Sequence, residues 1–324
     1  MENSLEKRIL ATLIWHDGLN FPLTAFEIWQ YLIKEKGARG DIPSLRAVEK
    51  TLQKSVFLRS KISSRRGFYF LKNREGLVES RIFQNKLSIK KWRRLREIIK
   101  LLSFIPYVRM IGVTGSMSFS HPRKESDLDV LIITARNRIW LTRFLVTLVT
   151  HLLGVRRHQQ KTRSRICLNH YVSEERLKVA GKSLYTALEY LKMVPVFGKE
   201  TYNKFIKENK WLADFLANPR TFQIQNKWLL KESKFQKISQ KFFEICFDNP
   251  VGDLVEKFLG KAQEKRIKRD SLYRKPGGRV RVSRFQLEFH PDSPEKGILE
   301  EFNKKAVSFN LNEFANQKNS GLLK

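Results

Sequence analysis

Residues 112–130 read Gly-Val-Thr-Gly-Ser-Met-Ser-Phe-Ser-His-Pro-Arg-Lys-Glu-Ser-Asp-Leu-Asp-Val. The apolar residues 108–113 before the turn and 128–134 after the polar loop predict two buried strands. Because side chains alternate along a strand, Asp127 and Asp129 should project to one side, about 7 Å apart, while Leu128 faces the core. The stretch therefore predicts two carboxylates directed at a single point.

Two carboxylates that converge in this way repel each other unless a cation lies between them. Mg²⁺, or Mn²⁺ in its place, binds through a few carboxylates and leaves other coordination positions to water and phosphates. Gly115 would let the backbone approach a phosphate, which the Ser116 hydroxyl and N–H could bind. A tight turn before a solvated strand explains Gly115 equally well, but it gives no reason for two like charges on one face.

Gly115-Ser116, ten further residues and then Asp127-Leu128-Asp129-Val130 resemble the signature of the nucleotidyltransferase superfamily of DNA polymerase beta, poly(A) polymerases and CCA-adding enzymes. The resemblance covers roughly residues 100–175 and implies a mixed sheet with helices. It also implies that Gly115 and Ser116 hold the triphosphate of a nucleoside triphosphate. Asp127 and Asp129 would then be the catalytic residues that bind the metal ions.

The superfamily places a third carboxylate on a later strand, and the corresponding position in residues 165–171 is Asn169. An amide oxygen can coordinate a hard cation, but it carries no charge, so Asn169 should be a weaker metal ligand. The neighbouring His170 should face the other way and belong to the core. The same residues suit a working enzyme with a reduced metal site or a degenerate one that only binds nucleotide.

The charge of the chain points to a polyanionic partner. The 324 residues carry a formal net charge of +31 and comprise 41% hydrophobic and 11% aromatic residues, enough to build globular cores. Residues 1–50 hold 7 basic and 7 acidic side chains, whereas residues 51–100 hold 15 and 3. Nucleic acid is the partner that this distribution favours.

Three helices and a basic hairpin are predicted before residue 73. Thr24 and Ser44 are candidate N-caps, Leu45, Val48, Leu52 and Val56 form the expected buried face of the third helix, and residues 57–71 look like two strands around a turn. This order resembles a winged helix-turn-helix. The resemblance implies nucleic-acid contacts from Arg46 and Lys50 on the third helix and from Arg59, Lys61, Arg65 and Arg66 on the wing.

Winged helices also serve as protein docking modules, so this part of the chain could instead bind a protein. The pattern does not choose between DNA and RNA.

The expected fold is α/β (α+β) with four parts. These are a winged helix-turn-helix domain (1–73), a linker helix (74–104), a nucleotidyltransferase domain (105–220) and a mainly helical, basic C-terminal region (221–324). Within the last part, residues 274–284 suggest a flexible loop or hairpin with an arginine face for phosphate, or a merely solvated loop. His290 is interpreted as a turn residue, and the tail after Phe314 as frayed.

The sequence thus predicts Mg²⁺-dependent transfer of a nucleotide monophosphate from a nucleoside triphosphate to a hydroxyl, with nucleic acid as acceptor or as recruiting surface. A nucleotide-sensing DNA-binding regulator without activity is the alternative, and transfer onto a protein hydroxyl is a third possibility. Two cysteines, Cys167 and Cys246, and the polar N-terminus favour a cytoplasmic protein. Because Arg143 and His151 interrupt the longest apolar run, no membrane partner is expected.

Overall fold

The structure is a computed structural model, and it describes residues 2–35, 42–158, 161–222, 226–275 and 278–315. The N-terminal unit contains four helices and a small antiparallel sheet of strand order β1-β3-β2. Its elements are α1 (Glu2–Gly18), β1 (Leu23–Thr24), α2 (Ala25–Gln30), α3 (Leu45–Lys54), α4 (Val56–Lys61), β2 (Ile62–Arg65) and β3 (Phe68–Leu71). The two expected N-caps are confirmed: the Thr24 and Ser44 hydroxyls accept hydrogen bonds from the N–H groups of Glu27 and Ala47.

Part of the expected hairpin is wrong. Residues 56–61 form helix α4, capped by the Ser55 hydroxyl, which accepts from the Leu58 N–H, so the hairpin starts only at Ile62. This second cap ends α3 and immediately begins another helix, which leaves Leu58 buried and Val56 78% exposed. Val56 was therefore wrongly expected on the buried face of the third helix.

A central six-stranded mixed sheet carries the rest of the fold, with strand order β7-β4-β5-β6-β9-β8. Only β5 and β6 are parallel; the other neighbours are antiparallel. The strands are β4 (Val108–Val113), β5 (Leu128–Thr134), β6 (Ile166–Ser173), β7 (Val194–Phe197), β8 (Arg279–Val282) and β9 (Gln286–His290). The mixed α/β class and the two strands expected beside the turn are thereby confirmed.

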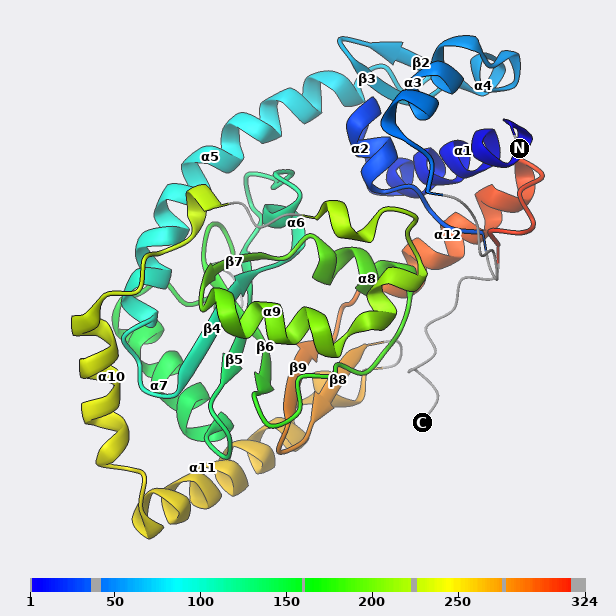
Figure 1. Ribbon diagram of the computed structural model, residues 1–324. Coiled ribbons are helices and arrows are strands. Elements are labelled where there is room, and N and C mark those ends of the chain that lie inside the picture. Colours follow the sequence, from blue (N-terminus) through cyan, green and yellow to red (C-terminus); the bar gives the residue numbers. More distant parts are fainter. Residues whose placement is uncertain (1, 36–41, 159–160, 223–225, 276–277, 316–324) are drawn as a thin grey trace.

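The long helix α5 (Leu77–Leu102) runs from the N-terminal unit to the sheet (Figure 1). The remaining helices are α6 (Gly115–Ser118), α7 (Ile139–Leu152), α8 (Leu184–Leu191), α9 (Lys199–Glu208), α10 (Lys234–Ile245), α11 (Pro250–Arg269) and α12 (Glu295–Ser308). Short 3-10 turns lie at Lys210–Asp214, Pro219–Thr221, Asn226–Trp228 and Ser271–Arg274. Among the described helices, none is both long and apolar enough to cross a membrane.

The C-terminal segment returns to both the sheet and the N-terminal unit. Strand β9 pairs with β6, and α12 packs against α1 (Figure 1). One hydrophobic core accordingly joins α1 to α8, α9 and α12, while a second lies between α5 and the sheet. The residues around the candidate turn are therefore held by elements from the whole chain.

The hairpin of β8 and β9 is formed, with Arg279 buried in the protein and Arg284, between the two strands, exposed. Arg279 is only 4% exposed and pairs with Glu189, Glu288 and Glu295, which gives this buried cation more than one carboxylate. Arg281 lies 3.9 Å from Glu288. Residues 276 and 277 of the expected loop, and the tail from residue 316 onward, lie outside the described residues.

Candidate functional site

Asp127 and Asp129 lie at the start of β5 and converge as expected. Leu128 and Val130, which alternate with them, are fully buried in the core beneath the sheet. Ligand atoms of Asp127, Asp129 and Cys167 lie within 4.8 Å of one another. The structure therefore brings the predicted carboxylate pair together and adds a thiol that the sequence did not indicate.

Gly115 packs directly against Asp129. Its φ is +61°, and a Cβ atom built on it would come within 2.4 Å of the Asp129 Oδ2. The N–H of Thr114, just before it, donates to the Asp129 carbonyl at 3.1 Å. The expected turn at Gly115 and Ser116 opens the short helix α6, and the Ser118 hydroxyl donates to the Gly115 carbonyl. Only glycine fits this left-handed position beside the carboxylate.

Arg157 is a site residue that sequence reasoning missed. Its Nη1 donates to the Asp127 Oδ2 at 2.6 Å and lies 3.5 Å from the Cys167 sulfur. It belongs to the basic run Arg156-Arg157-His158 after α7, which offered charge but no spacing that would place it beside Asp127. Asp127 thus pairs with a half-exposed arginine while it also lies near the Asp129 carboxylate.

Asn169 occupies the expected place beside Asp129, and its side-chain NH₂ group faces that carboxylate. Its Nδ2 donates to the Asp129 Oδ1 at 2.8 Å, while its buried Oδ1 has no hydrogen-bond partner among the described residues. The β5–β6 register shifts here: Asp129 pairs with Cys167 and Leu131 with His170. This irregularity, which inserts an extra residue in β6, brings Cys167 as well as Asn169 to the site.

The environment raises the pKa values of Asp129 and Cys167. Burial, followed by the nearby Asp127 and Glu189, raises the pKa of Asp129 to about 7, although Asn169 and Arg157 oppose the shift. Burial together with Asp129 and Asp127 raises the pKa of the Cys167 thiol to about 12. Near neutral pH the sulfur is therefore a protonated thiol.

Two histidines lie near the site. His170 is buried as expected, and its Nε2 lies 3.0 Å from the Gln286 side-chain nitrogen; burial lowers its pKa to about 3. His290 is not the turn residue that was expected. It ends β9, pairs with Arg279 across the hairpin, and places its Nδ1 3.5 Å from the Asn169 Nδ2.

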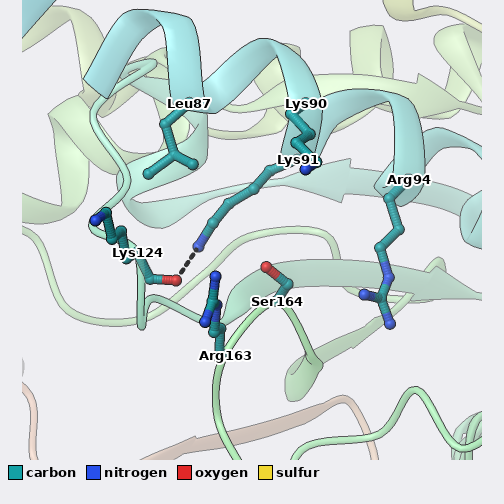
Figure 2. Close-up of a pocket in the computed structure, with 7 residues that line it drawn as sticks. All are labelled: Leu87, Lys90, Lys91, Arg94, Lys124, Arg163 and Ser164. Carbon is teal, nitrogen blue, oxygen red and sulfur yellow. Dashed lines mark hydrogen bonds between the residues drawn. The ribbon is translucent and has the colours of Figure 1, made fainter. Parts of the chain in front are cut away.

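A basic cavity lies next to the loop that leads into Asp127 (Figure 2). It measures about 430 Å³ and is lined by Leu87, Lys90, Lys91, Arg94, Lys124, Arg163 and Ser164. The buried Lys91 donates to the carbonyls of Arg123, Lys124 and Ser126, so its ammonium fixes the backbone immediately before Asp127. Sequence reasoning treated this part of α5 only as a linker.

The expected nucleic-acid residues are distributed differently from the prediction. Arg46 and Lys50 are exposed on α3, as expected. Arg59 and Lys61 lie on helix α4 and not on the hairpin: Arg59 donates to the Lys54 carbonyl, and the Lys61 Nζ lies 5.8 Å from the Phe309 ring centroid. Arg65 pairs with Glu79 at 3.0 Å, and Arg66 in the turn lies 4.0 Å from the same carboxylate. Of these four residues, only Arg65 and Arg66 thus belong to the hairpin of β2 and β3.

Comparison with family models, with curated proteins and with solved structures finds no match to this chain.

Proposed function

We propose that this chain is a Mg²⁺- or Mn²⁺-dependent nucleotidyltransferase that moves a nucleoside monophosphate from a nucleoside triphosphate to a hydroxyl, with nucleic acid as acceptor or recruiting surface. The observation that carries the proposal is the convergence of Asp127 and Asp129 beside Gly115, where a missing Cβ leaves the backbone open. The basic cavity along α5 supports a polyanionic substrate, because four exposed cations line it: Lys90, Arg94, Lys124 and Arg163.

The oxygen donors of the site fit a hard divalent cation. Asp127 and Asp129 would hold it, and the unpartnered Asn169 Oδ1 could join them if the amide turned over. The protonated Cys167 thiol suits a softer metal and is not expected to bind Mg²⁺. When bound, such a cation stabilises charge on the transferring phosphate.

The residues of the chain have separate roles in this proposal. The Ser116 hydroxyl and the N–H groups at the Gly115 turn would bind the triphosphate. Asp127 must release Arg157 to bind a cation, and the exposed part of that guanidinium would then be free to pair with a phosphate oxygen. In its present orientation the Asn169 amide holds the Asp129 carboxylate through the hydrogen bond from its Nδ2, and it would give up that bond if its Oδ1 turned to the cation.

The proposal is tested with α-³²P-labelled nucleoside triphosphates, Mg²⁺ or Mn²⁺, and a mixture of RNA, DNA and proteins. We expect label on an acceptor with the wild-type chain and none with Asp127→Asn and Asp129→Asn. Asp214→Asn, in the turn after α9, is the matched control. Transfer that survives both site changes would exclude this function, and the labelled band would distinguish a nucleic acid from a protein hydroxyl as acceptor.

A second candidate is a catalytically inactive, nucleotide-sensing regulator that binds DNA. The observation that favours it is that both carboxylates already have partners, since Arg157 pairs with Asp127 and the Asn169 amide donates to Asp129. Such a protein would bind one duplex sequence tightly, with an affinity that nucleotide changes, and would release no pyrophosphate. A pyrophosphate-release assay run beside the labelling experiment separates the two candidates.

A further inference from the structure

Helix α10 presents its polar side to the protein. Gln236 and Gln240 are buried, and both side chains donate to the Ser103 carbonyl. One turn later, the Glu244 carboxylate accepts two hydrogen bonds from Arg109, at 2.7 and 2.9 Å, and one from the Tyr107 N–H. Polar residues at positions i, i+4 and i+8 thus attach this helix to the body of the molecule.

Helix α11 is oriented in the same way. Its buried residues are Gly252, Glu256 and Gly260, again at intervals of one turn. The Glu256 carboxylate accepts from the N–H groups of Trp140 and Leu141 at the start of α7, at 2.9 and 2.8 Å. Gly260 packs on the Trp140 ring, where a Cβ would come within 3.0 Å. Small and acidic residues therefore form the buried part of the contact, and the partly buried Val255, Leu259 and Ile267 pack beside them.

Both helices expose large apolar side chains to solvent. The outward residues follow helical spacing, and their exposed fractions are Phe235 72%, Ile238 67%, Phe242 64%, Ile245 63%, Val251 65%, Leu254 68% and Phe258 69%. The adjacent helix α7 adds Phe144 at 41%, Leu148 at 41% and Leu152 at 74%. In a water-exposed helix the apolar stripe normally faces the core, so the amphipathicity of α10 and α11 is inverted.

The charges on these helices are separated as well. The acidic groups Glu244, Asp253 and Glu256 bind the body of the protein through Arg109, Arg138 and the α7 backbone. The cations are exposed instead: Lys234, Lys237, Lys241, Lys257, Lys261, Lys265, Arg266, Lys268 and Arg269. Of these, Lys237 and Lys268 have an acidic partner among the described residues, Glu232 and Glu264. The outer surface is consequently both apolar and positively charged.

We propose that α10 and α11, which lie at the periphery of the molecule (Figure 1), dock on a membrane surface that carries anionic headgroups. The phenylalanine, leucine and isoleucine side chains enter the boundary between headgroups and acyl chains, while the flanking lysines pair with headgroup phosphates. A second copy of the chain is disfavoured, since it would bring lysine-rich faces together. Nucleic acid would match the lysines but not cover the apolar side chains.

This inference differs from the sequence-based expectation of no membrane partner, because the helices lie on the bilayer and do not cross it. It is independent of nucleotide transfer. The sequence places these apolar residues at helical spacing, but only the structure shows that the opposite, polar side of each helix is the buried one.

The test is co-sedimentation of the full chain with vesicles of phosphatidylcholine alone or mixed equally with phosphatidylglycerol. We expect binding to the mixed vesicles, and a partition coefficient at least about tenfold lower for the double variant Phe242→Gln, Phe258→Gln. The matched control is Phe26→Gln, Phe83→Gln, which removes two rings that are 49% and 52% exposed elsewhere. It should bind like the wild type.

The role of charge is tested in the same assay with the double variant Lys241→Glu, Lys261→Glu. Its control is the double variant Lys50→Glu, Lys54→Glu, which changes the net charge by the same amount on the N-terminal unit. The first pair should lose vesicle binding and the second should retain it. Equal loss in both pairs would mean non-specific attraction by a basic chain and would overturn the proposal. The proposal would also be overturned if the Phe242→Gln, Phe258→Gln variant bound vesicles as well as the wild type. It would likewise be overturned if sedimentation velocity showed a wild-type dimer and a monomeric variant.

Discussion

At the scale of single residues, the site depends on how closely Gly115 approaches Asp129. The same contact places a backbone turn against a carboxylate whose pKa burial has raised to about 7. Each partner constrains the other: the carboxylate excludes any side chain at position 115, and the turn limits the solvation of Asp129. A small residue is therefore required here by packing as well as by backbone conformation.

Gly115→Ala should destabilise the fold and also impair cation binding. The new alanine must adopt a positive φ, and its Cβ also meets the Asp129 Oδ2. We therefore expect a loss of about 1–3 kcal/mol of unfolding free energy beyond the cost of the backbone conformation alone. Gly67→Ala is the control, because its φ is +80° but nothing lies within 4 Å of its Cβ. Urea unfolding of both variants measures the difference. Equal losses would show that the contact with Asp129 costs nothing.

At the scale of elements, helix α5 supports the loop that delivers Asp127. The Lys91 Nζ donates to three loop carbonyls, and the Ser164 N–H donates to one of them, that of Ser126. Burial lowers the pKa of Lys91, while the negative charges of Glu125 and Asp127 act in the opposite direction. This lysine is a positioning residue for the carboxylate site.

Lys91→Met should loosen that loop. The substitution keeps most of the buried stem but removes the donor that the three carbonyls share, and the Ser126 carbonyl keeps the Ser164 N–H described above. We expect a cost of about 1–3 kcal/mol. The exposed neighbour Lys90, changed to Met, should leave unfolding unaffected. Hydrogen exchange of residues 123–128 should accelerate in Lys91→Met alone. Unchanged exchange there would mean that other contacts fix the loop.

Helix α3 provides the clearest test of nucleic-acid contact by the N-terminal unit. Arg46 and Lys50 are exposed one turn apart, so each can reach a backbone phosphate. Changing either to Ala should weaken binding to mixed-sequence DNA or RNA and lower the slope of log K against log salt by about 1. Glu49→Ala is the control, because it removes a negative charge from the same helix instead of a positive one. A slope that stays constant in Arg46→Ala and Lys50→Ala would exclude this helix from the interface.

At the scale of the whole molecule, the N-terminal unit is joined to the remainder by a shared core and by buried polar groups. The ring centroids of His16 and Tyr31 lie 4.9 Å apart. The ammonium of Lys192, the residue that follows α8, lies 5.0 Å from the Tyr31 ring centroid. Asp17 pairs with Lys305 of α12 and with Arg74. The junction therefore combines apolar packing with charges that are partly removed from water.

Stability should fall as the solution becomes acidic, because burial lowers the pKa of His16 to about 3. The folded state favours the neutral His16 ring. The contribution of this neutral ring to the free energy of unfolding is complete above the ordinary pKa of about 6.5 and is lost as the pH falls towards 3. His16→Gln should reduce the slope of unfolding free energy between pH 6 and pH 4 by up to about 1.4 kcal/mol per pH unit. An unaltered slope in His16→Gln would contradict the prediction.

Several features could be predicted from the amino-acid sequence because they depend only on neighbouring residues. The caps at Thr24 and Ser44, the strands at Val108–Val113 and Leu128–Thr134, and the common side of Asp127 and Asp129 all follow from local hydrogen bonding and side-chain alternation. These features were enough to predict the mixed α/β class and the centre of the candidate site. The function attached to that site stays a prediction.

Long-range packing sets which distant residues complete the site and which sides of α10 and α11 are buried. Cys167 reaches Asp127 because β6 lies parallel to β5 with a shifted register. Arg157 reaches it because the segment after α7 pairs with the start of β6, and His290 arrives because β9 adds to the sheet beside β6. The inverted faces of α10 and α11 depend on partners such as Ser103 and Arg109, more than a hundred residues away. Local periodicity carries no information about such pairings, since they are fixed by long-range packing.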